Sequence, residues 1–140
     1  MAYADDNIFA KILRDEIPSY RVYENERTLA FMDAMPQVPG HTLVIPKYAA
    51  ENILDVNPDY LASTIQVTQR VAAAVKVAFD APGIMVAQLN GSAAGQTVFH
   101  LHFHIIPRHS GIEFKLHARD LEDPSVLEEH AQQIRAALQG

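Results

Sequence analysis

The segment His100-Leu101-His102-Phe103-His104-Ile105-Ile106 (HLHFHII) decides the fold that the sequence predicts. Three imidazoles alternate with apolar side chains, and alternate residues of an extended strand point to the same face. We therefore predict a strand over residues 98–106, closed by Pro107. Its histidines would form one row, about 6.6 Å apart at neighbouring Cα atoms of the row. The intervening apolar residues would face a core.

Working outward from this segment, the sequence predicts strands on both sides of one long helix. The other predicted strands cover residues 20–24, 28–33, 41–45 and 84–89. The long helix is capped by Asn57, starts at Pro58 and has an apolar stripe of Leu61, Ile65, Thr68, Ala72, Val75 and Phe79. A short helix or turn is expected over 7–17, and a last helix over 124–138 with Leu127, Ile134 and Leu138 on one side. Because short turns join the strands, we predict the α+β class with a mainly antiparallel five-stranded sheet.

Composition restricts the class of protein. The chain has 140 residues, 49% of them hydrophobic, which fits one globular domain over 1–140. The absence of cysteine excludes disulfides and thiolate metal sites. A net charge of −6 argues against binding to a nucleic-acid backbone but not against a small anionic ligand. The sequence has no apolar run of membrane-spanning length and begins with acidic residues, unlike a signal peptide, so we expect a cytoplasmic protein without a membrane partner.

Three interpretations of the histidine row compete. The row could be a solvated polar face, although threonine or lysine would serve that purpose equally well. It could bind a metal, since neutral imidazole is a common zinc ligand, but no carboxylate lies in the strand. It could also attack phosphorus: one imidazole is the nucleophile, a second holds the phosphate oxygens and a third fixes the tautomer of the first. The sequence favours the third interpretation.

The loop that precedes the histidines supports a phosphate site. Residues 91–95 have little side-chain bulk, so their backbone N–H groups can approach an anion closely. Gln96 and Thr97 add further donors beside the histidine row. By itself this loop could be an ordinary turn, but its position directly before the row indicates a functional loop.

These motifs together match a known pattern. Ala94-Gly95-Gln96-Thr97-Val98 precedes the histidines, Pro107-Arg108 follows them, and an upstream block runs from Phe31 through Pro36-Gln37-Val38-Pro39-Gly40-His41 to Pro46-Lys47. Over residues 7–108 the sequence resembles the histidine-triad (HIT) family, on its bacterial Hit/Hint-like side. The resemblance implies a HIT-like fold, and it leaves the extension 109–140 without an assigned role.

The resemblance also implies a reaction. Members of the family hydrolyse or transfer purine nucleotides at the α-phosphate through a nucleotidyl-histidine, with phosphoramidates, acyl-adenylates or dinucleoside polyphosphates as substrates. The nucleophile falls on His102, His104 and Thr97 contact the phosphate, and Gln96 lies near the leaving group. No cofactor is required, although a divalent metal is compatible with polyphosphate substrates. The alternatives are a nucleotide-binding or protein-interaction module with little turnover, and a metal hydrolase.

Further binding residues are carried over from the family. His100 would form a supporting relay with His41, and Asp33 would hold the ribose hydroxyls. The base slot would be lined by Ile8, Phe9, Ile12 and Leu43. A carboxylate suits a vicinal diol and a flat base suits an apolar slot. The four apolar residues could equally be plain core, Asp33 could cap the next turn, and His41 could be a satisfied buried histidine.

The chain departs from the family pattern in two places. Many bacterial relatives bind a structural zinc through Cys-x-x-Cys and a histidine, but those positions hold Asn7, Ala10 and Ala49 here, so we expect no such zinc. The position that usually holds Asn or Gln, aimed at the phosphate, holds Leu89. Either Asn90 replaces that contact or the contact is missing. The family is typically homodimeric, and we expect the long helix to serve both the core and a homodimer interface.

Overall fold

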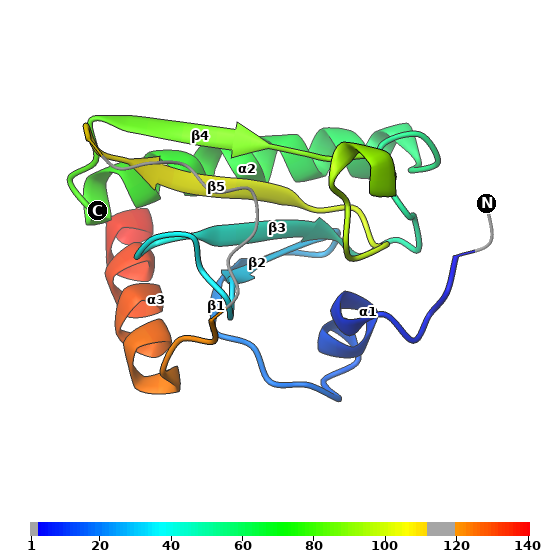
Figure 1. Ribbon diagram of the computed structural model, residues 1–140, viewed down its shortest axis with the longest axis horizontal. Coiled ribbons are helices and arrows are strands. Elements are labelled where there is room, and N and C mark those ends of the chain that lie inside the picture. The colour runs from blue at the N-terminus through cyan, green and yellow to red at the C-terminus, as the bar shows by residue number, and fades with distance from the viewer. Residues whose placement is uncertain (1–2, 112–119) are drawn as a thin grey trace.

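A single sheet forms the centre of the protein (Figure 1). The computed structural model describes residues 3–111 and 120–140. The strands are β1 (Arg21–Glu24), β2 (Thr28–Met32), β3 (Thr42–Pro46), β4 (Gly83–Ala87) and β5 (Phe103–Arg108). They lie in the order β1-β2-β3-β5-β4, and every neighbouring pair is antiparallel. The predicted α+β class and five-stranded antiparallel sheet are confirmed.

Three α-helices and one 3-10 turn complete the described fold. They are α1 (Ile8–Leu13), α2 (Pro58–Ala78), η1 (Ser92–Ala94) and α3 (Pro124–Gln139). Each α-helix begins with a side-chain cap that satisfies a backbone N–H of the first turn. Asn57 accepts from Asp59 N at α2, Asp123 from Ser125 N at α3, and Asn7 from Ala10 N at α1. At α1, the cap is thus formed between the side chain of Asn7 and the backbone N–H of Ala10.

The sheet has two buried faces because alternate residues of its strands point in opposite directions. Val44 and Ile105 join the larger core, to which α2 and α3 contribute. Leu43 and Ile45 join a smaller cluster with α1. In Figure 1, α2 lies behind the sheet, while α1 lies apart from both other helices. The face toward α1 carries the candidate site.

The structure corrects the predicted histidine strand. β5 begins only at Phe103, so His100 and His102 lie before it, and the strand continues through Pro107 to Arg108. Leu101 N donates to Ala50 O, so this part of the segment bonds to a loop. The alternation nevertheless persists outside the strand: Leu101, Phe103 and Ile105 are all in the larger core, as predicted.

Other boundaries and faces also shift. The predicted 84–89 strand ends at Ala87, and the helix predicted over 7–17 ends at Leu13, where Arg14 is its C-cap. The buried stripe of α2 is formed by Thr64, Val67, Thr68, Val71, Ala74 and Val75. Ile65, predicted on the buried stripe, is 44% exposed. In α3 the buried residues are Leu127, Ala131 and Ile134, and Leu138 is partly buried.

The described helices include none with the length and hydropathy needed to cross a bilayer. Residues 112–119 of the predicted extension 109–140 lie outside the described residues. The described end of the extension contributes α3 to the larger core.

Candidate active site

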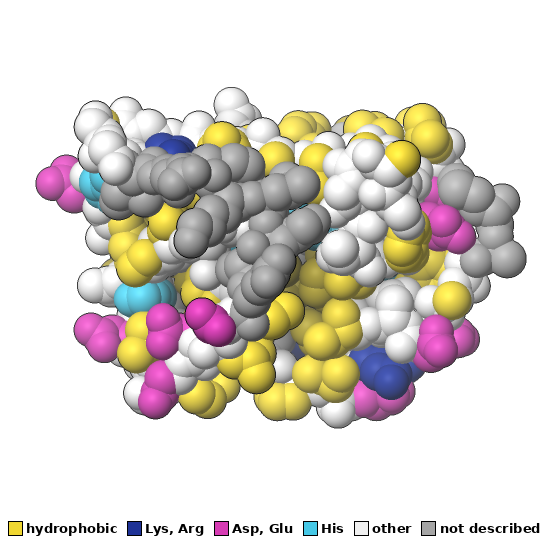
Figure 2. Space-filling view, in the orientation of Figure 1, with side chains coloured by type: hydrophobic (Ala, Val, Ile, Leu, Met, Phe, Trp, Pro, Cys, Tyr) yellow, Lys and Arg dark blue, Asp and Glu magenta, His cyan; other side chains and the backbone are white. Residues whose placement is uncertain are grey.

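A cavity of about 410 Å³ lies between α1 and the sheet. Figure 2 shows hydrophobic side chains gathered around a hollow in the lower centre of this face. Most of the predicted site residues line the cavity: Ile8, Phe9, Ile12, Asp33, His41, Leu43, Thr97, His102 and His104. Its volume falls within the range of small-molecule sites, and its lining combines many apolar side chains with a few polar groups, as such sites do.

The sheet register brings these residues together. Leu43 of β3 pairs with Phe31 of β2 on one side and with His104 of β5 on the other. All three therefore point to the same face, toward α1. Asp33 follows β2 and His41 precedes β3, and the Asp33 N–H donates to the His41 carbonyl. Two neighbouring strands thus deliver an acid and an imidazole to one end of the cavity.

His102 is held by the backbone beside it. Its Nδ1 lies 2.8 Å from the His100 carbonyl oxygen. A carbonyl can only accept, so the proton of a neutral His102 is on Nδ1 and Nε2 keeps its lone pair. The side chain is buried but lines the cavity, and its ring packs edge-on against Phe9, with centroids 4.9 Å apart. Burial lowers the pKa of His102, which favours the neutral, nucleophilic ring.

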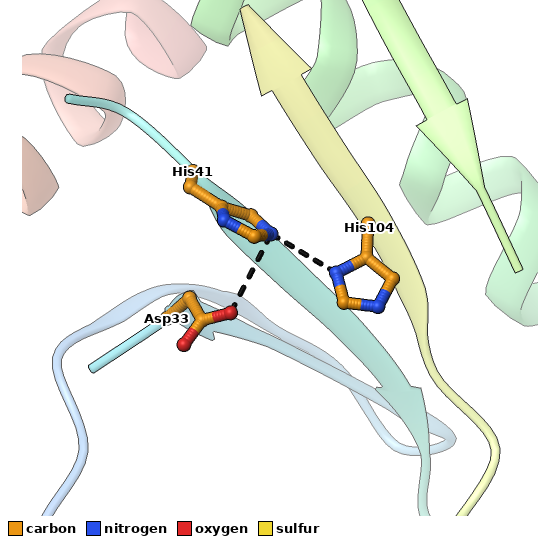
Figure 3. A group of neighbouring side chains, drawn as sticks. All are labelled: Asp33, His41 and His104. Carbon is orange, nitrogen blue, oxygen red and sulfur yellow. Dashed lines mark hydrogen bonds and ion pairs between the residues drawn. The ribbon is translucent and has the colours of Figure 1, made fainter. Parts of the chain in front are cut away.

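His104 is held in the opposite tautomer by two hydrogen bonds in series, of which Figure 3 shows the one between His41 and His104. The Gln37 N–H donates to His41 Nδ1 at 3.0 Å, so the proton of a neutral His41 is on Nε2. That nitrogen lies 3.0 Å from His104 Nδ1, which must accept. The proton of a neutral His104 is therefore on Nε2. The ring centroids of His102 and His104 are 4.9 Å apart, so a nitrogen with a lone pair and an N–H donor belong to adjacent rings of one cavity.

Asp33 and His41, the acid and the base at this end of the cavity, both have shifted pKa values. Burial raises the pKa of Asp33 to about 6, although the hydrogen bond from the Met35 N–H lowers that pKa in part. Burial, with the neighbouring His104 and His102, lowers the pKa of His41 to about 3. His41 is therefore neutral at physiological pH, as its hydrogen bonds require. Asp33 both caps a turn through Oδ1, to Met35 N at 2.9 Å, and presents Oδ2 3.5 Å from His41 Nε2.

Asp33, His41 and His104 also offer ligand atoms within 4.8 Å of one another, close enough for one metal ion. A histidine that binds a metal normally donates its other ring N–H to a carbonyl, carboxylate or water. Here the other nitrogen of His41 accepts the Gln37 N–H instead. A metal on Nε2 would have to replace the proton that the Gln37 contact places there. The arrangement thus suits a hydrogen bond between the rings of His41 and His104 better than a metal ion bound between them.

The predicted relay between His100 and His41 is wrong. His100 Nε2 lies 2.9 Å from the Pro46 carbonyl oxygen, and its Nδ1 lies 2.6 Å from the Tyr3 hydroxyl. Both ring nitrogens are thus occupied, and His41 pairs with His104 instead. His100 is 1% exposed, and burial lowers its pKa to about 4. The first histidine supports the site from behind and does not line the cavity.

Several polar groups of the loop before the histidines are hydrogen-bonded within the protein. Gln96 is 3% exposed: its amide nitrogen donates to Glu51 O and Val98 O, and its oxygen accepts from Gly91 N. The N–H groups of residues 94, 95 and 96 bond to carbonyls of the same loop. Asn90 accepts from Ile53 N and pairs with Gln88. The side chains of Gln96 and Asn90 and the N–H groups of residues 94–96 are therefore engaged within the protein and do not line the cavity as predicted, whereas Thr97 does.

Comparison with known proteins agrees with this geometry. The sequence profile of the HIT domain matches residues 14–111. The chain belongs to the HIT family. This is a family of nucleotide-binding hydrolases and transferases.

Three HIT proteins illustrate the similarity. A solved Hit-like protein of Bartonella henselae is 54% identical, with a TM-score of 0.91 over 97% of this chain and 99% of that one. The protein hit of Bacillus subtilis is 40% identical over 125 residues, 86% of each chain. An adenosine 5′-monophosphoramidase of Saccharomyces cerevisiae is 39% identical over 101 residues, which are 72% of this chain and 61% of that protein.

One departure from the HIT pattern now has a structural description. Leu89, at the position where Asn or Gln is usual, is half-buried and does not line the cavity. Since the carboxamide of Asn90 is engaged by the backbone of residue 53 and by Gln88, Asn90 does not replace the contact. The polar group expected there is therefore missing from this HIT protein.

Sequence reasoning missed several contributors. Gln37 acts through its backbone N–H, which residue type does not reveal. Tyr3 reaches His100 from 97 positions away, and no local pattern predicts that contact. Leu121 lines the cavity because Glu122 N donates to Ala34 O and ties the C-terminal segment beside the Asp33 turn. Met35 also lines the cavity, and its place two residues after Asp33 was the available signal.

Proposed function

We propose that this HIT protein cleaves purine nucleotide derivatives at the α-phosphate through a nucleotidyl-His102 intermediate. The observation that carries the proposal is the opposed state of two adjacent rings. His102 donates through Nδ1 and keeps a lone pair on Nε2, while His104 accepts at Nδ1 and keeps its proton on Nε2. One ring is ready to attack phosphorus and the next is ready to donate to the phosphate oxygens.

The reaction follows from these states. His102 Nε2 attacks the α-phosphorus, the Nε2–P bond forms, and the bond from phosphorus to the leaving group breaks in line. The leaving group takes up a proton from solvent and departs. Water then attacks phosphorus and releases a proton to solvent, the Nε2–P bond breaks, and a nucleoside 5′-monophosphate leaves while the ring regains its lone pair. The His104 Nε2–H would hydrogen-bond a non-bridging oxygen throughout, and the Thr97 hydroxyl would assist from the cavity wall.

The rest of the cavity suits a nucleoside. Phe9, Ile12 and Leu43 line it with apolar surface that would receive a flat base. Asp33 lines the same cavity, with Oδ2 3.5 Å from His41 Nε2, and its carboxylate would accept from the two ribose hydroxyls. The yeast relative that is an adenosine 5′-monophosphoramidase supports a phosphoramidate as the first substrate to test.

The decisive experiment compares wild type, His102→Asn and His109→Asn with adenosine 5′-phosphoramidate. His109 is exposed and serves as the matched control. We expect His109→Asn to keep wild-type activity and His102→Asn to lose at least about a thousandfold in kcat, as when other catalytic nucleophiles are removed. Intact mass after rapid acid quench should show one nucleotidyl group on wild type alone. Equal turnover by wild type and His102→Asn would refute the proposal, and AMP binding without turnover by wild type would favour a nucleotide-binding module.

We also propose that the protein is a homodimer. β4 is an edge strand of the sheet, and beside it a groove is lined by Ile65, Gln66, Thr68, Gln69, Ala72 and Val86. Ile65 and Val86 are nearly half exposed. An edge strand with exposed apolar neighbours is a favourable surface for pairing with a second copy. This surface includes residues of α2 from the stripe that the sequence assigned to both core and interface.

A further inference from the structure

The N-terminal segment reaches the histidine cluster through a single side chain. The Tyr3 hydroxyl lies 2.6 Å from His100 Nδ1, and the two rings meet edge to face with centroids 5.7 Å apart. Residues 97 positions apart in the sequence are thereby joined behind the cavity. Tyr3 itself does not line the cavity, so we expect no direct contact with a nucleotide that binds there.

The direction of this hydrogen bond is determined by the other side of the ring. His100 Nε2 donates to the Pro46 carbonyl, which can only accept, so Nδ1 of the neutral ring carries a lone pair. The Tyr3 hydroxyl must therefore donate to Nδ1. Burial raises the pKa of Tyr3 and keeps the hydroxyl protonated. The Tyr3 hydroxyl and the Pro46 carbonyl thus hydrogen-bond to the two ring nitrogens of His100.

The residue held in this way orients the proposed nucleophile. The backbone carbonyl of His100 accepts from His102 Nδ1 and thereby places the lone pair of His102 on Nε2. His100 precedes β5, so this carbonyl lies outside the regular ladder. Its peptide unit is held on one side by the Leu101 N–H, which donates to Ala50 O, and its residue is held on the other by the two hydrogen bonds of the His100 ring. Without the Tyr3 hydroxyl, a 1%-exposed imidazole would keep an unpaired Nδ1, and His100 would be free to shift.

We propose that Tyr3 is a positioning residue for catalysis: its hydroxyl holds His100 in the place from which the His100 carbonyl orients His102. The proposal rests on the proposed function, because it assigns Tyr3 to the same nucleophile. The proposal assigns this role to the Tyr3 hydroxyl and not to its ring, since ring packing alone would leave the Nδ1 of His100 without a donor.

The test compares Tyr3→Phe, which keeps the ring and removes the hydroxyl, with Tyr3→Ala, which removes both. Tyr48→Phe is the matched control, because Tyr48 is exposed and packs against Tyr60. We expect Tyr3→Phe to lower kcat about three- to tenfold with KM unchanged, the effect of one lost hydrogen bond on a step that substrate binding does not sense. Tyr3→Ala should lose at least as much, and Tyr48→Phe should match wild type.

A spectroscopic readout distinguishes positioning from general stability. In ¹⁵N-histidine-labelled wild type, His102 should show the Nδ1–H tautomer, and Tyr3→Phe should populate the Nε2–H form. Wild-type kcat in Tyr3→Phe, or a lowered kcat with the His102 tautomer unchanged, would overturn the proposal. If His102→Asn is inactive while Tyr3→Phe is fully active, only the Tyr3 inference fails. If His102→Asn is active, the proposed function fails first.

Discussion

Replacing Asp33 by asparagine should make the protein more stable and less able to bind nucleotide. Burial raises the pKa of Asp33 from an ordinary 3.8 to about 6. A folded-state pKa above the unfolded value means that the free energy of unfolding falls as pH rises through this interval, and the cost is complete at neutral pH. The difference of about two pKa units corresponds to about 3 kcal/mol. Because the side chain is 20% exposed, solvent screening reduces this to about 2 kcal/mol.

Asparagine removes the buried charge and keeps an oxygen that can accept the Met35 N–H, so the turn survives. We expect Asp33→Asn to raise the free energy of unfolding by about 2 kcal/mol at about pH 7.5, or Tm by about 8 °C. At about pH 4.5 the gain should fall to about a third, because the wild-type carboxyl is then largely protonated when folded. The KM for adenosine 5′-phosphoramidate should rise at least about tenfold, the cost of losing hydrogen bonds to a charged acceptor.

Guanidinium denaturation at both pH values provides the measurement, with the exposed Asp6→Asn as control. Asp6→Asn should stay within about 0.5 kcal/mol of wild type, as surface substitutions usually do. An Asp33→Asn variant that is no more stable than wild type at neutral pH would contradict the burial argument. A gain of equal size at both pH values would show that the stabilisation does not come from the carboxyl charge.

Three further predictions follow from other parts of the structure. Phosphoramidate hydrolysis should be unchanged after chelator treatment, because the Gln37 N–H opposes a metal on His41; activity that returns only with added metal would contradict this. Gln96→Met should lower the free energy of unfolding by about 3 kcal/mol in denaturant titration, since it leaves buried backbone groups of the loop unpaired; a loss below about 1 kcal/mol would show that the loop re-pairs. Ile65→Glu combined with Val86→Glu should convert the dimer to a monomer in sedimentation equilibrium, and an unchanged mass would exclude this face as the interface.

The sheet and its faces could be predicted because they depend on periodicity. Leu101, Phe103 and Ile105 reach the predicted core even though the strand starts later than expected, since extended chain alternates whether or not it is paired in a ladder. The α2 stripe was less well predicted. Thr68 is buried as predicted, but Thr64 was not on the predicted stripe. Thr64 is buried because its hydroxyl bonds the Tyr60 carbonyl one turn earlier, an option that hydrophobic spacing does not consider.

The site was predicted by residue type where a side chain meets the cavity and missed where it meets the backbone. Apolar residues and histidines lie together on the face toward α1, and the resemblance to a known family had assigned a role to each of them. Gln96 and Asn90 carry the same groups as ligand-binding residues, but their amides satisfy loop backbone instead. Only three-dimensional contacts separate these two uses, because the chemical groups are identical.

The three histidines of the motif are chemically equal, and their differences come from what the backbone offers each ring. A carbonyl beside Nδ1 leaves the lone pair of His102 on Nε2, as the proposed nucleophile requires. A carbonyl beside Nε2 makes His100 an acceptor at Nδ1, which requires the Tyr3 donor. For His104 a backbone N–H acts one ring away, through His41. Since carbonyls only accept and N–H groups only donate, three fixed backbone groups are enough to assign every proton in the cluster, and the proposed chemistry needs that assignment more than it needs shifted acidities.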